Sequence, residues 1–420
     1  MNISKAIRIS VLIATSSSVY AEGVDPFTTS ENDDLVAGNM SNLTASLDFI
    51  YQGTYIPELR HIQSNELFEN NAIVDSQIKW TISDDAKIKT RGMVSYSLKQ
   101  LGGNSSDESD IKALEYYYEH RLSKAGHYVS VGRKNLGWSA GFQWRPADLI
   151  DNGFTTKNFD SMDPARYSGI DQAQYEMIGG FVDYSLLVST HDKSFYRGKQ
   201  IASKISFKRF IDGSLFYAKV GDYSEKFGLA LDGNLPWATT FVLEAVQVEI
   251  DKSNLTDPFY FGKTLESLSG IGSYQDIFLG LTRYIDDKQR FSVEYFHNGR
   301  GFRHGMQEKM IDQSVSHYMK SGGGSLFIDS KIFEEQYLGR NYLYVAYTGF
   351  HPGYEAQVKP SVLVNMDDGS YIGSLSVKKE FGGNSELLIK ANYYHGGKES
   401  DFGSISPGIS FGVSYLLHVF

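Results

Sequence analysis

The chain has 420 residues, a formal net charge of −10 and no cysteine, and these facts exclude several classes of protein. Without cysteine there is no disulfide framework, no thiolate metal site and no lipid anchored on an N-terminal cysteine. The acidic balance leaves no basic face that could neutralise a phosphate backbone, so nucleic acid is not expected as a partner.

The N-terminal segment has the layout of a secretory signal peptide. A short charged region precedes an apolar stretch at residues 9–15, which is too short to span a bilayer as a helix. Small residues then occupy the −3 and −1 positions before a cleavage site. The residues that define this layout are Lys5, Arg8, Val19 and Ala21. We therefore expect the mature protein to begin near Glu22.

After this segment the sequence favours strands over helices. The chain holds 28 Tyr, 26 Phe and 41 Gly but only 9 Pro, a composition that suits strands and tight turns. Apolar and polar residues alternate with period two, as in residues 43–55, and no segment sustains an apolar stripe with a period of 3.6. No later run of eighteen or more apolar residues is present, so membrane-spanning helices are not expected.

Eighteen candidate strands can be counted from this alternation. They lie near residues 43–55, 70–81, 86–98, 111–120, 126–133, 170–178, 181–190, 199–208, 213–221, 226–232, 238–250, 272–285, 290–297, 340–349, 355–365, 371–379, 385–394 and 408–420. Their length of about ten residues suits a tilted strand that crosses a bilayer.

The connections between these strands alternate between short and long. The short ones are rich in turn-forming residues and lie at 83–85, 123–126, 179–180, 211–213, 232–236, 286–288, 351–353 and 382–384. The other set includes long polar segments at 56–69, 99–110, 134–169, 251–271, 299–339 and 395–407. This alternation predicts an all-β, transmembrane, antiparallel up-and-down β-barrel of about 18 strands (16–18), with short periplasmic turns and long extracellular loops.

The pattern resembles the porin-type β-barrels of the Gram-negative outer membrane, and the resemblance covers nearly all of the mature chain. The passage Val131-Gly-Arg-Lys-Asn-Leu-Gly-Trp138, followed by Pro146-Ala-Asp148, looks like a strand-to-loop passage of several porin-like families. The chain also ends on an aromatic residue, Phe420. The resemblance implies a multi-pass barrel in the cell outer membrane, in contact with outer-membrane lipid and lipopolysaccharide. It also implies that the barrel-assembly machinery reads the C-terminal strand ending at Phe420.

In that arrangement residues 1–21 are the signal peptide, residues 22–42 a periplasmic N-terminal segment and residues 43–420 the transmembrane barrel.

The polar face of each strand is expected to line the lumen, because the other face meets lipid. Charged residues then form a strip on the second, third and fourth strands: Lys79, Lys87, Lys89, Arg91, Glu115 and Glu119. The four cations either attract anions into the pore or are neutralised by the two glutamates through cross-strand pairing. The sequence leaves both readings open.

The connection at residues 134–169 is long enough to suggest a function of its own. In porin-type barrels such a loop often folds inward and narrows the channel, and we expect the same here, with an outward, solvated loop as the alternative. The charged residues predicted to line the pore or its constriction in this region are Arg133, Arg145, Asp148, Asp151, Asp160, Asp163 and Arg166, with Trp138, Phe142, Trp144 and Phe154 as aromatic neighbours.

The function favoured by these features is a channel for passive diffusion or uptake of small polar solutes, selected by pore width and lumen charge. No metal, cofactor or enzymatic activity is expected, because the ten histidines show no spacing with Ser, Asp or Glu that is typical of a catalytic cluster. The alternative is a closed or assembly-linked barrel that serves polysaccharide export or surface attachment.

Overall fold

The computed structural model describes residues 42–57, 67–101, 104–139, 144–148, 162, 164, 168–191, 198–209, 211–221, 224–250, 273–299, 301, 339–404 and 408–419. Within these ranges no helix is both long and apolar enough to cross a membrane. The same ranges contain β1 (Asn42–Ile56), β2 (Leu67–Ser83), β3 (Ala86–Leu101), β4 (Asn104–Ser123), β5 (His127–Lys134), β6 (Ile170–Ile178), β7 (Val182–His191), β8 (Gly198–Phe207), β9 (Ile211–Val220), β10 (Ser224–Leu235), β11 (Thr239–Ile250), β12 (Ser273–Asp286), β13 (Gln289–His297), β14 (Asn341–His351), β15 (Ala356–Asn365), β16 (Tyr371–Phe381), β17 (Ser385–His395) and β18 (Ile409–His418).

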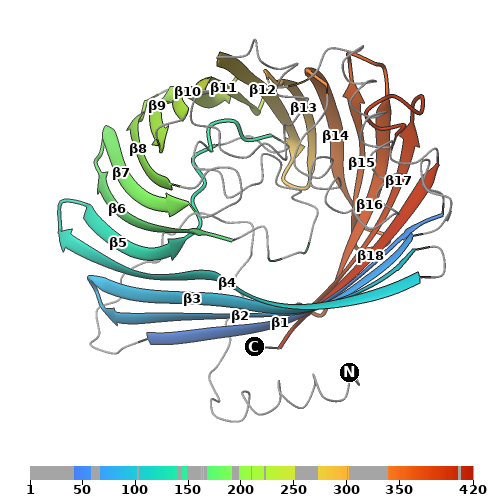
Figure 1. The fold of residues 1–420 in the computed structure, drawn as a ribbon, viewed down its shortest axis with the longest axis horizontal. Helices are drawn as coiled ribbons and strands as arrows, with labels where there is room; N and C mark the ends of the chain where they lie inside the picture. The colour runs from blue at the N-terminus through green and yellow to red at the C-terminus, as the bar shows by residue number, and fades with distance from the viewer. Residues whose placement is uncertain are drawn as a thin grey trace.

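These eighteen strands form one closed barrel (Figure 1). Each strand pairs antiparallel with its neighbours in the chain, and β1 pairs with both β2 and β18. The closing seam runs from Asp48 opposite His418 to Tyr55 opposite Phe411. Closure leaves no strand edge without a partner, which is what a sheet in lipid requires. The predicted antiparallel barrel of about eighteen strands is confirmed.

The connections follow the predicted alternation. Eight of them, beginning with the one between β2 and β3 and ending with the one between β16 and β17, contain two to four residues. They all lie at one end of the barrel, because the strands run alternately up and down. The polar connection predicted at 99–110 is the exception. These residues belong to β3 and β4 apart from 102 and 103, and Leu101 pairs with Asn104.

That correction has a physical reason. β1 to β4 have 15, 17, 16 and 20 residues, whereas about 9–11 residues suffice to cross a bilayer. The extra length at the long-loop end has polar residues on both faces, including Asp107 and Glu108. The composition of such a segment is typical of a loop, yet its backbone groups form the hydrogen-bonded pairs between β3 and β4.

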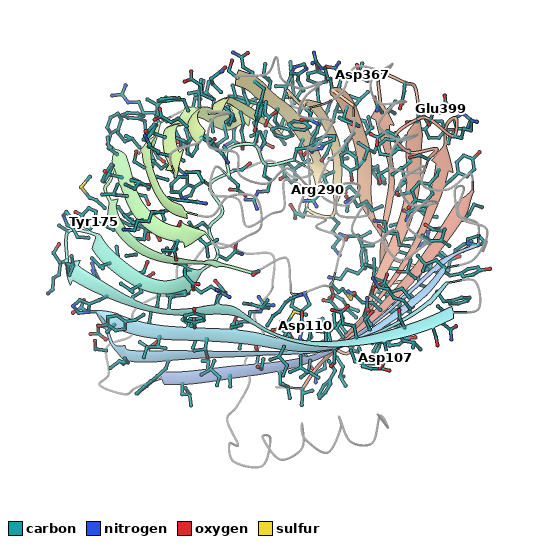
Figure 2. The ribbon with its side chains drawn as sticks, viewed as in Figure 1. Asp107, Asp110, Tyr175, Arg290, Asp367 and Glu399 are labelled. Carbon is teal, nitrogen blue, oxygen red and sulfur yellow. The ribbon has the colours of Figure 1, made fainter. Side chains whose placement is uncertain are left out.

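Side chains alternate between the two faces of the barrel wall. On β3, Met93 is 5% exposed on the inner face while its neighbour Val94 is 50% exposed on the outer face. Figure 2 shows the same division, with Arg290 of β13 inside the ring and Tyr175 of β6 on its outer side. The large apolar side chains of the outer face are therefore exposed, and polar groups gather inside.

The buried apolar residues lie on the inner wall, where chain segments fold against it. One cluster joins Ala147 to Leu187, Phe216 and residues of β8 to β11. A second joins Trp144 to Phe278, Phe296, Tyr342 and neighbouring residues of β12 to β16. The connection between β5 and β6 thus enters the barrel, and its described parts are visible inside the ring in Figure 1.

A charged inner wall and an inward-folded loop

Three of the four predicted basic residues, Lys87, Lys89 and Arg91, form ion pairs with residues of adjacent strands. Lys87 Nζ lies 2.9 Å from Glu119 Oε1, directly opposite it in register. Lys89 Nζ lies 2.9 Å from Glu115 Oε2, and Glu115 is only 5% exposed. Carboxylates buried to this degree need a cation or hydrogen-bond donors to offset their lost hydration. These contacts favour the reading in which the glutamates neutralise the cations.

Arg91 is paired on the other side of β3. Its guanidinium donates hydrogen bonds to both carboxylate oxygens of Asp75 on β2, at distances from 2.5 to 3.2 Å. Asp75 is 4% exposed and lies opposite Asp48 in register. Asp48 in turn contacts His418, whose Nδ1 lies 2.8 Å from Asp48 Oδ1. A row of ionisable side chains therefore crosses the closing seam on the inner wall.

Lys79 differs from the other three cations. It lies opposite Lys89 in register, and it forms no ion pair among the acidic side chains of the described residues. Lys89 itself is engaged by Glu115. Of the four predicted basic residues, Lys79 is thus the one whose charge is least compensated by neighbours in the described part of the wall.

Lys134 extends this ionic network beyond the predicted residues. Its Nζ lies 3.1 Å from Glu119 Oε2 and 3.4 Å from Glu176 Oε2. The next residue, Asn135, donates its backbone N–H to Glu115 Oε1 at 3.1 Å. The network therefore joins β3, β4, β5 and β6 at the point where the chain leaves β5 for the inward loop.

Arg133 was expected to line the pore, but it lies on the opposite face of β5 from Lys134. Its guanidinium donates to Asp171 at 2.7 Å and lies 5.4 Å from the ring centroid of Tyr116. Asp171 shares its face of β6 with Tyr175, which is outside the ring in Figure 2. Because successive strand residues point to opposite faces, the inward position of Lys134 places Arg133 on the outer face.

Glu244 of β11 fixes the inward loop to the opposite wall. Its side chain is fully buried, and it accepts hydrogen bonds from Ser139 Oγ at 2.7 Å and from the backbone N–H of Ala147 at 3.0 Å. Ser139 and Ala147 lie on the two described stretches of the loop, on either side of residues 140–143. A buried carboxylate with these donors ties both stretches to one position on the wall.

Two tryptophans add apolar anchors to the same loop. Trp144 is fully buried; its ring stacks on Phe296 with the centroids 5.3 Å apart and meets Tyr344 edge-on at 6.4 Å. Trp138 stacks on Phe216 of β9 with the centroids 5.9 Å apart. The prediction that this loop folds inward is therefore matched by its described parts, which contact β9, β11, β13 and β14.

The predicted constriction residues Arg145 and Asp148 form a compact turn within the loop. Asp148 Oδ1 accepts the backbone N–H groups of Trp138 and Ser139 at 2.6 and 2.8 Å. Arg145 lies 3.2 Å from Asp148 Oδ2 and also donates to the carbonyl of Ser139. Both charges therefore hold the shape of the loop. The other predicted constriction residues, Asp151, Asp160, Asp163 and Arg166, lie outside the described residues.

A second segment joins the wall near Trp144 from the long-loop end. Asp401, between β17 and β18, is 4% exposed and accepts the hydroxyl of Tyr342 at 2.5 Å. Phe402 meets the ring of Tyr342, which in turn lies 6.2 Å from the ring of Trp144. Two connections from distant parts of the chain are thus packed together inside the barrel.

Glu244, Lys134 and Tyr342 were not among the residues predicted from the sequence. Each occupies an inward position of an alternating strand, so its face could be predicted. Their partners could not, because Glu244 and Ser139 are 105 positions apart and no local pattern links them. In the turn of Asp367, Asp368 and Gly369, the side chain of Asp367 accepts the backbone N–H groups of Arg340 and Asn341.

The comparisons with known proteins identify the fold. No family model and no curated protein matches the chain. Among solved structures, Pseudomonas aeruginosa OccK7 (OpdD) matches with a TM-score of 0.52 at 9% identity, covering 90% of this chain and 100% of that chain. Acinetobacter baumannii OccAB1 matches with a TM-score of 0.52 at 10% identity, covering 90% and 97%. Pseudomonas aeruginosa OccK5 (OpdH) gives 0.51 at 9% identity, covering 90% and 98%. The chain has the fold of a porin-type β-barrel.

Proposed function

We propose that this protein is a channel in the outer membrane of a Gram-negative bacterium, through which small polar solutes pass by diffusion. The observation that supports this proposal best is the closed eighteen-strand barrel with an apolar outer face, a polar inner wall and a loop folded into the lumen. The similar solved barrels support the same class of fold. Transport of this kind uses no cofactor, and we assign no catalytic role.

The apolar side chains of the outer face indicate that the barrel lies in a membrane and not in water. Side chains such as Leu43, Trp80 and Val131 are between 41% and 54% exposed. A soluble protein would expose such large residues singly rather than on most strands of a closed sheet. In a bilayer the same side chains meet hydrocarbon, and the closed ladder satisfies every backbone group that lipid cannot.

The inner wall supports selection by size and charge. A barrel of eighteen strands is wide enough for an aqueous lumen, and the loop anchored on Glu244 and Trp144 occupies part of that space. Most charges on β2 to β5 are paired, so the strip does not act as a uniform anion attractor. We infer that pore width near the loop limits which solutes pass and that Lys79 contributes to charge preference.

The remaining parts of the proposal concern delivery and insertion. Residues 1–21 act as a cleaved signal peptide. Residues 22–41 precede the barrel in the periplasm, because β1 begins at Asn42, one residue earlier than predicted. The C-terminal segment, which continues from β18 to Phe420, is read by the assembly machinery, and the outer face contacts lipid and lipopolysaccharide. Phe420 and residues 1–41 lie outside the described residues, so these assignments rest on the sequence.

Two measurements on the full mature chain test the proposal. Reconstitution into planar bilayers should give discrete conductance steps, and liposomes that contain the protein should swell in solutions of small sugars, amino acids or organic acids. Absence of conductance steps together with exclusion of every solute would contradict the channel. That result would support the alternative, a closed or assembly-linked barrel for polysaccharide export or surface attachment.

A further inference from the structure

A recess lies on the inner wall of β11 to β15, away from the ionic strip of β2 to β5. It begins near the short-turn end, since Thr240 and Arg290 are each the second residue of their strand. Its upper limit is Phe278, which also belongs to the cluster around Trp144. A solute that had passed the inward loop would meet this recess next.

The wall of the recess carries a row of hydroxyl groups. Thr240 lies opposite Thr282, and Thr282 lies opposite Ser292 in register. The hydroxyls of Thr282 and Ser292 are 3.0 Å apart, and Thr348 lies opposite Arg290 on the next strand. Neighbouring strands are about 4.8 Å apart, so these groups form a ladder across the wall. Each hydroxyl both donates and accepts hydrogen bonds.

Gly280 leaves room for the ring of Phe278 to lie against the wall at the edge of the recess. It lies opposite Glu294 and faces the lumen between Phe278 and Thr282. A Cβ at this position would lie 2.9 Å from Phe278 Cζ, closer than real side chains tolerate. The recess has a volume of about 180 Å³. One water needs about 10–15 Å³ of space of this kind, so the recess, which is open to the lumen, has room for several waters or for one small organic solute.

Charges of both signs line the same recess. Arg290 and Lys359 contribute cations and Glu294, which is 3% exposed, contributes a carboxylate. Lys359 Nζ lies 5.9 Å from the ring centroid of Tyr344, the register partner of Glu294. In the register Lys359 falls at the level of Thr348 and Arg290, and its amine extends along the wall toward Tyr344, so the three charges are spread along the recess. A cationic ligand would meet repulsion from Arg290 and Lys359, and an anionic ligand would meet repulsion from the buried Glu294.

We propose that this recess is a binding subsite for a small, neutral, polyhydroxylated solute such as a monosaccharide or sugar alcohol. Hydroxyl groups of the solute accept hydrogen bonds from Arg290 and Lys359 and donate to Glu294, and charge-assisted bonds of this kind are the stronger ones. The hydroxyl ladder adds donors and acceptors along one side of the solute. The inference rests on the proposed function, because it names the solute class for the same lumen.

The test uses the full mature protein, with D-xylose as the probe and L-serine and L-lactate as the zwitterionic and anionic comparisons. The variant Thr282→Val, Ser292→Ala removes two hydroxyls of the ladder with little change in shape. Ser374→Ala is the matched control, because Ser374 also faces the lumen and donates to Asn392 at 2.7 Å. We expect the dissociation constant for xylose to rise about tenfold in the double variant, as for the loss of two modest hydrogen bonds, and to stay unchanged in the control.

A second pair of variants tests the space itself. Gly280→Val displaces the Phe278 ring at the edge of the recess and narrows the recess, so it should abolish measurable xylose binding. Gly412→Val is its control on β18, where a Cβ would meet only ordinary contacts at 3.8 and 4.0 Å. Unchanged xylose affinity in both the hydroxyl variant and Gly280→Val would overturn the inference, as would tighter binding of serine or lactate than of xylose to the wild-type protein.

Two separate readouts distinguish failure of the subsite from failure of the channel. Conductance in potassium chloride alone reports the channel, and titration calorimetry of xylose with the detergent-solubilised protein reports the subsite. Conductance without xylose binding would overturn the subsite and leave the channel. Xylose binding that the variants remove, in a protein that never conducts, would support the subsite and contradict the channel.

Discussion

Ser139, in the connection that follows β5, and Glu244, on β11, meet inside the barrel with Ser139 Oγ 2.7 Å from each carboxylate oxygen. This contact crosses the lumen side of the wall and joins segments 105 positions apart. Together with the packing of Trp138 and Trp144 it holds the inward loop in place, and its contribution can be tested directly.

Replacing Ser139 by Ala should loosen the loop. The variant keeps the bond from the Ala147 backbone to Glu244 but leaves the buried carboxylate short of one donor, at a cost of about 1–3 kcal/mol. We expect a noisier open state and a higher mean single-channel conductance in planar bilayers. Ser206→Ala, which removes an inward hydroxyl hydrogen-bonded to Ser214 at 2.9 Å, is the control. Equal single-channel conductance and noise in Ser139→Ala and Ser206→Ala would show that the contact between Ser139 and Glu244 does not hold the loop.

Trp144→Ala should release the loop more completely. Truncation of a fully buried tryptophan removes about 3–5 kcal/mol of packing, so the loop should leave the aromatic wall of β13 and β14 and the conductance should rise. Trp237→Ala is the matched control, since Trp237 is 82% exposed in the turn between β10 and β11. A conductance that stays at the wild-type value in Trp144→Ala would place the narrowest point of the pore elsewhere.

Deletion of residues 146–163 should also raise the conductance, because it removes Asp148 and the bond from Ala147 to Glu244 together. This deletion tests whether the loop forms the constriction at all. Unheated and heated samples would be compared in detergent gels, because a difference in migration between them shows that the variant still forms a folded barrel. A folded deletion variant with unchanged conductance would contradict the predicted constriction.

Lys79→Gln should shift the ion preference of the pore toward cations. Its charge has no ion pair with the acidic residues of the described wall, so its removal changes the field in the lumen. The double variant Lys87→Gln, Glu119→Gln removes one charge of each sign from a pair at 2.9 Å and should change the preference less. Reversal potentials in a salt gradient measure both, and the opposite order of effects would be inconsistent with local neutralisation.

His418→Leu should weaken the closing seam of the barrel. The variant removes the contact between His418 Nδ1 and Asp48 Oδ1 at 2.8 Å, where β18 meets β1, and leaves a partly buried carboxylate without that partner. A loss of about 1–3 kcal/mol is expected. The temperature at which the folded band disappears in detergent gels should fall. His395→Leu, at the end of β17 and away from the seam, should have a smaller effect if seam closure is the cause.

Much of the fold could be predicted from the sequence, because its signals are local. Alternation in residues 43–55 predicted β1, and turn-forming residues such as those at 382–384 predicted the short connections that the structure contains. The prediction of a connection at 99–110 was wrong, because the Gly, Ser and Asp residues of this segment are typical of loops. The paired backbone of β3 and β4 nevertheless continues through all but two of these residues.

The candidate site was less predictable. The inward course of the loop was anticipated from its length, but not its anchors, Glu244 and the aromatic group around Trp144. Arg133 was predicted to line the pore or its constriction. Its face depends on the phase of β5, which the contacts of Lys134 with Glu119 and Glu176 establish.

The sequence by itself determined that the chain is a barrel of about eighteen strands with one apolar and one polar face, because strand periodicity and turn residues act over a few neighbouring positions. Tertiary structure alone decided which charges cancel, where the inward loop is held and where the inner wall leaves a recess beside Gly280. These outcomes depend on strand register and on contacts between residues a hundred or more positions apart, and no local pattern of residues encodes such distances.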